Sequence, residues 1–481
     1  MKIVLFTLNA SFAHSSLSLR CLRPPLEQAG HTVILQENTL KDRTSHVLEE
    51  LYGHRADVYG FSCYIWNLEP MLLLAQALHD LLPTSRIVLG GPEVSFDCER
   101  FEALPFADVI VRGEGEDVLP RLCAQWERGE EPDRIQDGEC RDFLKPNGFL
   151  YRADERCGTL AYYESSRGCP YSCAYCLSSA TTGVRAKDVP QVLEELAEFE
   201  RLPTTVRVIK LVDRTFNFDI HRANAIWSAL LDEKYTKCYH FEICAALLNE
   251  ESFAILSRFP KGKVRLEIGL QSTNQKTLSA SARHLDAEKT LEATGRLYQM
   301  GNLHVHLDLI AGLPYEDYAS FARSFDEAYG ACDVLQLGFL KLLHGTALRR
   351  DKEKYGYRFL SKPPYTVLQS RWISFAEMQR LSRIAEVLER YCESGAFPHT
   401  LWYLNARMPS PFAFFEGLSE YYRKHVPHSL QRTSQPDAFR HLLEYAMTTD
   451  LDIDPARLRE YLRADFSEHE HKNPPYFLRE Q

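Results

Sequence analysis

Three cysteines stand close together in the stretch SSRGCPYSCAYC, at Cys169, Cys173 and Cys176. Thiolates at such short spacings are typical metal ligands. A structural zinc site needs four ligands, usually as two Cys-x-x-Cys pairs, and Cys157, 12 residues upstream of Cys169, could complete one. The alternative is a four-iron four-sulfur cluster held by three thiolates, which leaves one iron free to bind a substrate. We favour the cluster because no second Cys-x-x-Cys pair accompanies the first.

The composition is that of a folded protein with two or three domains: 481 residues, 45% hydrophobic and 25% charged. The net charge of -10 disfavours a nucleic-acid partner. Thirteen cysteines without dense, even spacing indicate reduced thiols. No apolar run is long enough for a membrane span, and the N-terminal stretch does not have the pattern of a signal peptide. We therefore predict a cytoplasmic protein without a membrane partner.

The elements before the cysteines alternate between apolar strand-like runs and helical stretches such as 68–82. Near-continuous apolar runs of this length are typical of strands covered on both faces. The runs lie at 3–8, 32–36, 57–65, 86–91 and 108–113. This alternation predicts an α/β domain with a doubly wound, Rossmann-like parallel sheet.

A second strand and helix series surrounds and follows the cysteines. Its strand-like runs lie at 160–168, 206–213, 239–245, 264–271, 304–314 and 333–343. Six such units predict a partial (β/α)6 barrel related to the TIM barrel, with its chemistry at the C-terminal strand ends. The pattern after about residue 365 is helical alone. The expected divisions are 1–135 for the first domain, 136–158 for a linker, 159–365 for the barrel and 366–481 for a helical domain.

The cysteine pattern, with Tyr175 before the third thiol, resembles the radical S-adenosylmethionine (radical SAM) superfamily. Four later stretches fall in the family's order: KLVDRTFNFD, HFEICA, LEIGLQSTNQKTLSASAR and DLIAGLPYED. The resemblance implies a 4Fe–4S cluster on the three cysteines and SAM at its open iron. The residues that it implies for SAM are Tyr175, Asp213, Glu242, Gln271, Ser272, Arg283 and Gly312. In the plainer alternative Asp213, Glu242 and Gln271 are ordinary strand-end polar groups and Arg283 is a solvated helix charge.

The first domain carries SCYIW, VLGGPEVS and ADVIVRGEGED, which resemble the cobalamin-binding domain that precedes many radical SAM barrels. The resemblance implies that Ser62, Gly90 and Gly91 border a cobalamin groove. In a plain flavodoxin-like domain the two glycines would only make a turn. The D-x-H-x-x-G pattern of other cobalamin domains is incomplete around His14, which lacks the Asp and the Gly. We therefore expect cobalamin to bind without a standard histidine lower ligand.

The two resemblances cover about residues 1–370 and imply a radical SAM methyltransferase. Such an enzyme cleaves SAM reductively and transfers a methyl group from cobalamin to an unactivated carbon. The substrate, a small molecule or a peptide, is unknown, and no catalytic residue is assigned. A reductant such as flavodoxin or ferredoxin would supply electrons. The C-terminal helices resemble a domain of unknown function, and their aromatic stretch 397–425 could form core or line a substrate cavity.

Three other functions remain open. Some relatives perform ring contraction or another cobalamin-dependent radical rearrangement. A methylthiotransferase-like enzyme would need further N-terminal cluster ligands, for which Cys21, Cys63 and Cys98 are widely spaced. A non-catalytic cobalamin or iron–sulfur sensor would signal through the C-terminal helices.

Overall fold

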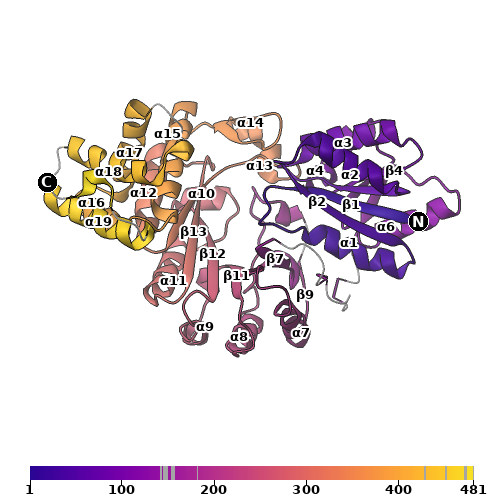
Figure 1. Ribbon diagram of the computed structural model, residues 1–481, viewed down its shortest axis with the longest axis horizontal. Coiled ribbons are helices and arrows are strands. Elements are labelled where there is room, and N and C mark those ends of the chain that lie inside the picture. The colour runs from indigo at the N-terminus through magenta and orange to yellow at the C-terminus, as the bar shows by residue number, and fades with distance from the viewer. Residues whose placement is uncertain are drawn as a thin grey trace.

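The computed structural model places three parts of the chain in a row, with the N-terminal sheet at one end and the C-terminal helices at the other (Figure 1). It describes residues 1–140, 143–144, 150–152, 158–180, 183–426, 430–449, 452–470 and 474–479. Cys157, required for the zinc alternative, and parts of the expected linker 136–158 lie outside the described residues.

The first part is a six-stranded parallel sheet in the order β2-β1-β3-β4-β5-β6. Its strands are β1 (Lys2–Asn9), β2 (Thr32–Thr39), β3 (Val58–Ser62), β4 (Arg86–Gly90), β5 (Val109–Gly113) and β6 (Ile135–Gly138). Its longer helices are α1 (Leu17–Gln28), α2 (Thr44–His54), α3 (Leu68–Leu81) and α6 (Val118–Glu127), with the short α4 (Pro92–Ser95) and α5 (Glu99–Glu102).

Both faces of this sheet are covered, which explains the continuous apolar runs of its strands. Alternate residues of β1 pack against α2 and α3 on one face and against α1 and α6 on the other (Figure 1). The predicted doubly wound sheet is confirmed. The sheet continues to Gly138 and so includes the beginning of the stretch expected as a linker.

The second part is a curved parallel sheet in the order β14-β13-β12-β11-β10-β7, which confirms the partial barrel of six strands. The strands are β7 (Leu160–Tyr163), β10 (Val208–Leu211), β11 (Cys238–Ile243), β12 (Val264–Gln271), β13 (His304–Ala311) and β14 (Val334–Phe339). The helices are α7 (Val189–Phe199), α8 (Ile220–Ala229), α9 (Glu250–Leu256), α10 (Gln275–Ala280), α11 (Ala287–Gln299) and α12 (Tyr318–Tyr329).

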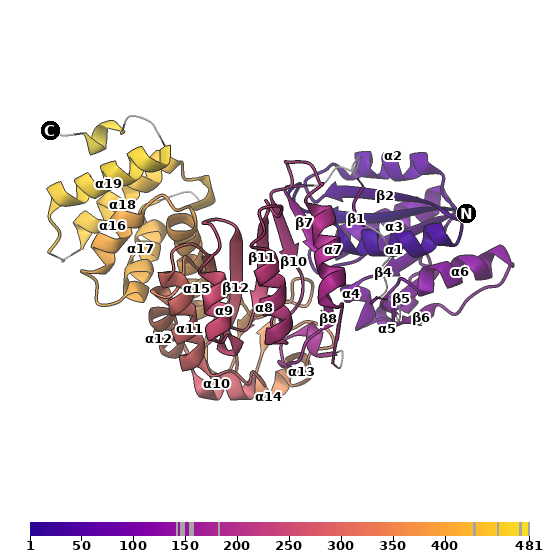
Figure 2. The ribbon, with the colours of Figure 1, turned by 90° about the horizontal axis from the view of Figure 1, so that it is seen from below.

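Helices α7, α8, α9 and α11 lie side by side along the outside of this sheet (Figure 2). The strands alternate accordingly: in β13 every second residue is buried and the others are only partly covered. The buried set packs in the helix-covered core, and the partly covered set faces the barrel interior.

A two-stranded antiparallel hairpin, β8 (Ser166–Gly168) and β9 (Val184–Ala186), stands beside the barrel, and the three cysteines lie in its long connection. Helices α13 (Ala347–Arg350) and α14 (Lys352–Tyr355) and strands β15 (Arg358–Phe359) and β16 (Val367–Gln369) follow the barrel. The expected strand over 160–168 is therefore wrong in one respect: it is two strands, β7 and β8, with a break at Glu164 and Ser165.

The third part is helical, as predicted. It contains α15 (Phe375–Leu388), α16 (Pro398–Asn405), α17 (Pro411–His425), α18 (Gln435–Thr448) and α19 (Pro455–Glu470). The aromatic stretch 397–425 contributes mainly to the core, because Phe397, Phe414 and Phe415 are buried, whereas Trp402 is exposed. Among the described helices, none combines the length and hydrophobicity that a membrane span requires.

Candidate functional site

The cysteine loop lies at the C-terminal ends of the barrel strands and contacts the loops that follow two of them. Cys169 Sγ is 3.6 Å from Thr215 Oγ1, just beyond β10. Cys173 Sγ is 3.6 Å from Nη1 of Arg283, which follows α10. The backbone N–H of Cys176 donates to the carbonyl of Cys173 at 3.0 Å, which turns the loop back on itself. The barrel rim therefore fixes two of the three thiols individually.

The geometry of the three thiols is compatible with a cluster. All three thiols are free of disulfides. Within the described part of the chain, no three Cys, His, Asp or Glu side chains converge on one point as a single ion would require. The thiolates of an iron–sulfur cluster bind different irons and need not converge. The Arg283 guanidinium also places a positive charge beside Cys173, where it would support a thiolate ligand.

Asp213 ties the base of the cysteine loop to β10. Its carboxylate is fully buried and accepts hydrogen bonds from the Ser165 N–H (3.1 Å), the Ser165 hydroxyl (2.6 Å) and the Ser166 hydroxyl. Arg222 donates to the same Ser165 hydroxyl at 2.9 Å. Burial raises the pKa of Asp213, and the serine hydrogen bonds oppose that rise. This geometry is that of a positioning residue, and a direct contact between Asp213 and SAM stays a prediction.

Gln271 and Arg283 meet above the end of β12, beside Cys173. Arg283 Nη2 donates to the Gly269 carbonyl at 2.5 Å. Gln271 has a left-handed backbone (φ +73°) at a bulge of β12, and its Nε2 is 2.2 Å from where a Cβ on Gly269 would be. Its buried Oε1 accepts no hydrogen bond from the described residues. The arrangement leaves an acceptor available at the barrel mouth, next to the cysteine loop.

Arg283 is not the solvated helix charge of the plainer alternative, because its side chain is half-buried and its guanidinium contacts Cys173 Sγ and the Gly269 carbonyl. Burial opposes the charged form, but Tyr175 and Cys173 raise the pKa of Arg283 above its ordinary range. Tyr175, in turn, has a pKa raised chiefly by burial. Tyr175, Arg283 and Gln271 thus gather around Cys173, as the sequence predicted for residues of one site.

Ser272 and Gly312 lie farther from the cysteines, and no described hydrogen bond joins them to the loop. Ser272 is fully buried, and its hydroxyl accepts from the Asn274 N–H at 2.9 Å. The Gly312 carbonyl accepts from the Tyr357 hydroxyl at 3.1 Å. Glu316, which ends the GLPYE stretch, was not among the residues predicted for the site. It is 1% exposed, and burial raises its pKa. Because it lies beside the predicted site, the GLPYE stretch alone was sufficient to predict it as a site residue.

The barrel interior is strongly polar, and of this group sequence analysis selected only Glu242. Lys210 Nζ lies 2.8 Å from Glu267 Oε2 and 3.6 Å from Glu242 Oε1, and His240 Nε2 lies 2.9 Å from Glu267 Oε2. Asp308, on β13, belongs to the same group electrostatically, since Glu267 and Glu242 raise its pKa. Polar residues at alternate positions of HFEI, RLEIG and HVHLD are the sequence signal for this group. In a barrel, alternate residues of each strand face the interior.

Asp308 should make the stability of the protein depend on pH. Burial, with Glu267 and Glu242, raises its pKa from 3.8 to about 7. Its favourable contribution is therefore complete below pH 3.8 and lost as the pH rises through about 7. Asp308→Asn, which is neutral throughout, is expected to exceed the wild type in unfolding free energy by roughly 1–3 kcal/mol at pH 8 and to match it near pH 4. Urea unfolding at both pH values measures this, and a pH-independent difference would contradict it.

A cavity of about 780 Å³ separates the C-terminal edge of the first sheet from the hairpin of the barrel part. All three residues predicted for cobalamin line it: Ser62, Gly90 and Gly91. From the other side it is lined by Arg167 and Gly168, which immediately precede Cys169. The cavity thus reaches from the glycine pair to the base of the cysteine loop.

The two glycines of this cavity have different roles. Gly91 has a φ of +104°, and a Cβ there would lie 2.5 Å from the carbonyl oxygen of Cys63, so no other residue fits. A Cβ on Gly90 would meet only Val111 Cβ, at 3.9 Å. Gly90 therefore leaves space open at the floor of the cavity, whereas Gly91 shapes its turn.

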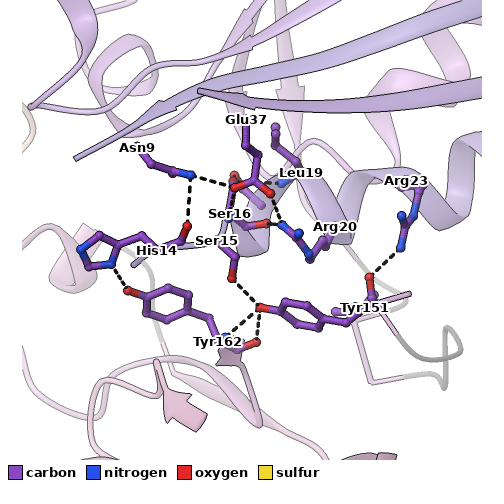
Figure 3. Close-up of polar contacts among 12 residues, drawn as sticks. Asn9, His14, Ser15, Ser16, Leu19, Arg20, Arg23, Glu37, Tyr151 and Tyr162 are labelled. Atoms are coloured by element: carbon purple, nitrogen blue, oxygen red, sulfur yellow. Dashed lines mark hydrogen bonds and ion pairs between the residues drawn. The ribbon is translucent and has the colours of Figure 1, made fainter. Parts of the chain in front are cut away.

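His14 reaches across the boundary between the two parts (Figure 3). Its Nδ1 is 2.6 Å from the hydroxyl of Tyr162 on β7, and the two rings stack. The neighbouring Ser15 hydroxyl donates to the carbonyl of Leu160 at 3.1 Å. A tyrosine of the barrel part thus stands where the D-x-H-x-x-G pattern supplies an aspartate, and the expectation of cobalamin without a standard histidine ligand stays a prediction.

Three family models match the chain in succession. Residues 3–123 match the B12 binding domain, 163–328 the Radical SAM superfamily, and 353–481 a protein of unknown function, DUF4080. The chain thus carries, in this order, regions that match a B12 binding domain, the Radical SAM superfamily and a domain of unknown function. This confirms the predicted class and the order of its parts.

Several relatives of known sequence are methyltransferases by name. The chain is 27% identical to 2-(S-pantetheinyl)-carbapenam-3-carboxylate methyltransferase of Streptantibioticus cattleyicolor (55% of this chain, 44% of the relative). It is 26% identical to the cobalamin-dependent radical SAM methyltransferase TokK of Streptomyces tokunonensis (72% and 55%). It is also 26% identical to hopanoid C-3 methylase of Methylococcus capsulatus (61% and 60%). The matches thus span about half of each relative's length, and they support the predicted enzyme class.

Solved structures share the fold. The cobalamin-dependent SAM radical enzyme OxsB, with aqua-cobalamin and SAM bound, aligns over 98% of this chain and 79% of its own with a TM-score of 0.66 and 15% identity. The radical SAM methyltransferase TsrM of Kitasatospora setae, with cobalamin and a [4Fe-4S] cluster bound, aligns over 76% and 78% with a TM-score of 0.61 and 16% identity. These likenesses confirm the predicted fold class.

Proposed function

We propose that the protein is a radical SAM enzyme that transfers a methyl group, through cobalamin, to an unactivated carbon of a small molecule or peptide. Cys169, Cys173 and Cys176 would hold the 4Fe–4S cluster. The observation that carries the proposal is the shared cavity: the residues predicted for cobalamin and those that lead directly into Cys169 line the same space. Two cofactors that must act on one substrate need such adjacency.

When bound, an iron–sulfur cluster with an open iron position cleaves SAM reductively and so makes a radical that removes hydrogen from carbon. The chain's own residues would position and shield this chemistry. Arg283 places a positive charge against Cys173, and the Oε1 of Gln271 offers an acceptor at the barrel mouth. The polar interior around Lys210 and Glu242 would hold polar groups of SAM or substrate. Enclosure by the barrel excludes water from the radical.

The remaining assignments belong to the same proposal. The domains are 1–135, to which the end of β6 adds residues up to Gly138, then 159–365 and 366–481, and the remainder of 136–158 is the linker. Electrons come from a small reductant such as flavodoxin or ferredoxin, and the enzyme acts in the cytoplasm. For cobalamin we propose Ser62, Gly90 and Gly91. For SAM we propose seven residues: Tyr175, Asp213, Glu242, Gln271, Ser272, Arg283 and Gly312.

The test is anaerobic reconstitution of the full chain with iron, sulfide and cobalamin, followed by reduction in the presence of SAM. We expect formation of 5'-deoxyadenosine and a change in the cobalamin spectrum on binding. Incubation with labelled methyl-SAM and cell extract should then label a product. If the protein with both cofactors bound formed no 5'-deoxyadenosine, the proposed enzyme activity would be wrong and a non-catalytic sensor would be favoured. If it formed 5'-deoxyadenosine but no labelled product, a radical rearrangement would be favoured.

Gly90→Leu should weaken cobalamin binding without affecting the iron–sulfur cluster. The new side chain would enter the open floor of the cavity at a backbone conformation that leucine can adopt. We expect cobalamin affinity to fall at least tenfold, measured by absorbance titration, while the iron content stays at the wild-type level. The matched control is Gly53→Leu on the exposed side of α2, which should bind cobalamin as the wild type does. Equal affinity of both variants would contradict cobalamin binding in this cavity.

A further inference from the structure

Two arginines stand directly opposite each other in the hairpin that carries the cysteine loop. Arg167 of β8 pairs with Arg185 of β9 in the antiparallel register. Like charges at directly opposed positions destabilise a strand pair. The hairpin has only these two short strands, so it offers little backbone pairing to offset the repulsion.

Two of the opposing charges come from the first domain, besides that of Glu164 in the barrel part. Glu114 lies between the two arginines: one oxygen contacts Arg185 Nη2 and the other is 3.4 Å from Arg167 Nη1. Glu116 Oε1 accepts from Arg167 Nη2 at 2.5 Å. Both glutamates belong to the RGEGE stretch that follows β5. Two of the three carboxylates that pair with the hairpin arginines therefore belong to the domain proposed for the other cofactor.

The Arg167–Glu116 pair is enclosed, whereas in the neighbouring pair the Arg185 side chain is 36% exposed and that of Glu114 23%. The Arg167 side chain is 13% exposed and the Glu116 side chain 11%, so salt screens the pair weakly. Arg167 also lies over the ring of Phe143 at 4.4 Å and donates to Glu164 at 2.8 Å. An ion pair at the open surface contributes little, whereas removing one partner of an enclosed pair leaves a charge without compensation.

The position of the hairpin gives this contact a consequence for the cofactors. Gly168 and Val184 are the last paired residues, and the chain between them carries all three cysteines. Arg167, Arg185, Glu114 and Glu116 all line the cavity proposed for cobalamin. A shift of the hairpin would therefore move the cysteine loop relative to both the barrel rim and this cavity.

We infer that Glu114 and Glu116 are positioning residues for the iron–sulfur site: through Arg167 and Arg185, the first domain holds the hairpin from which the cysteine loop extends. The inference rests on the proposed function, because it assumes the cluster on that loop. Glu114 is the central residue, since its carboxylate pairs with both arginines. The first domain thus acts on the cluster as well as lining the cobalamin cavity.

The first test is Glu114→Gln in the reconstituted full chain, compared with Asp137→Asn. The control removes the exposed Arg112–Asp137 pair next to the same stretch without touching the hairpin. We expect Glu114→Gln to lose cluster iron to a chelator about tenfold faster than the wild type, as for other groups that support metal ligands. Its reduced cluster should also show a weaker change in electron paramagnetic resonance on SAM addition. Asp137→Asn should match the wild type in both.

The second test removes the repulsion between Arg167 and Arg185. Glu114→Gln combined with Arg185→Gln leaves a single arginine, which Glu116 and Glu164 still neutralise, so iron loss should return toward the wild-type rate. Glu114→Gln with wild-type iron retention, or a double variant as poor as or poorer than the single one, would overturn the inference. A wild type that binds no cluster would instead overturn the proposed function, so the two failures are distinguishable.

Discussion

Cys173→Ala is expected to abolish cluster binding. Cys173 is the middle ligand of the proposed three, it is 5% exposed, and both Arg283 and the Cys176 N–H hold its position. Two remaining thiolates cannot hold three irons of a four-iron cluster. After anaerobic reconstitution, iron and sulfide should fall to the level of unspecific binding, and 5'-deoxyadenosine formation should fall to that of cluster-free protein. Chemical iron analysis and the visible spectrum measure the first, and chromatography the second.

The matched control is Cys123→Ala. Cys123 is equally buried, but it lies on α6 in the core of the first domain, where it packs under the sheet. The variant should cost about 1 kcal/mol in unfolding free energy and keep full iron and activity. Full iron content in Cys173→Ala would contradict the three-cysteine site and assign the cluster to other ligands.

The fold could be predicted because each long strand carries its own signal. Both sheets bury their strands on at least one face, so the apolar runs had to be long and the sequence between them helical. The hairpin carries no such signal, since SRG and VRA are too short and too polar to predict as strands. The break between β7 and β8 has a tertiary cause: Ser165 turns to Asp213, and the strand over 160–168 cannot continue through it.

The sequence indicates which cysteines and glycines are candidate ligands, but not which distant residues support them. Cysteine spacing and glycine pairs are local, and the structure brings Tyr175, Gln271 and Arg283 to the loop as their order suggested. The ion pairs are not local: Arg167 meets Glu116 across 51 residues, and Lys210 meets Glu267 across 57. Nothing near Arg167 in sequence shows that a glutamate of another domain neutralises it. Such partners become visible only when the topology is fixed.

Asp213→Ala is expected to have the largest effect on stability. The carboxylate is fully buried and accepts three hydrogen bonds, from the Ser165 N–H and hydroxyl and from the Ser166 hydroxyl. Alanine would leave these donors unpaired at 1–3 kcal/mol for each unsatisfied group, which partial relaxation would reduce. We expect a loss of about 3–5 kcal/mol in unfolding free energy. Urea unfolding monitored by circular dichroism measures it.

Asp213→Ala should also lower the iron content, because Ser165 and Ser166 lead directly into the cysteine loop. Asp219→Ala is the control: this exposed carboxylate begins α8 by accepting from the N–H groups of His221 and Arg222, so its loss should cost about 1 kcal/mol and leave the iron content unchanged. If the two variants lost equal stability and both retained iron, Asp213 would be an ordinary strand-end carboxylate. If Asp213→Ala stayed stable but no longer bound SAM, the residue would contact SAM directly, as the sequence pattern predicts.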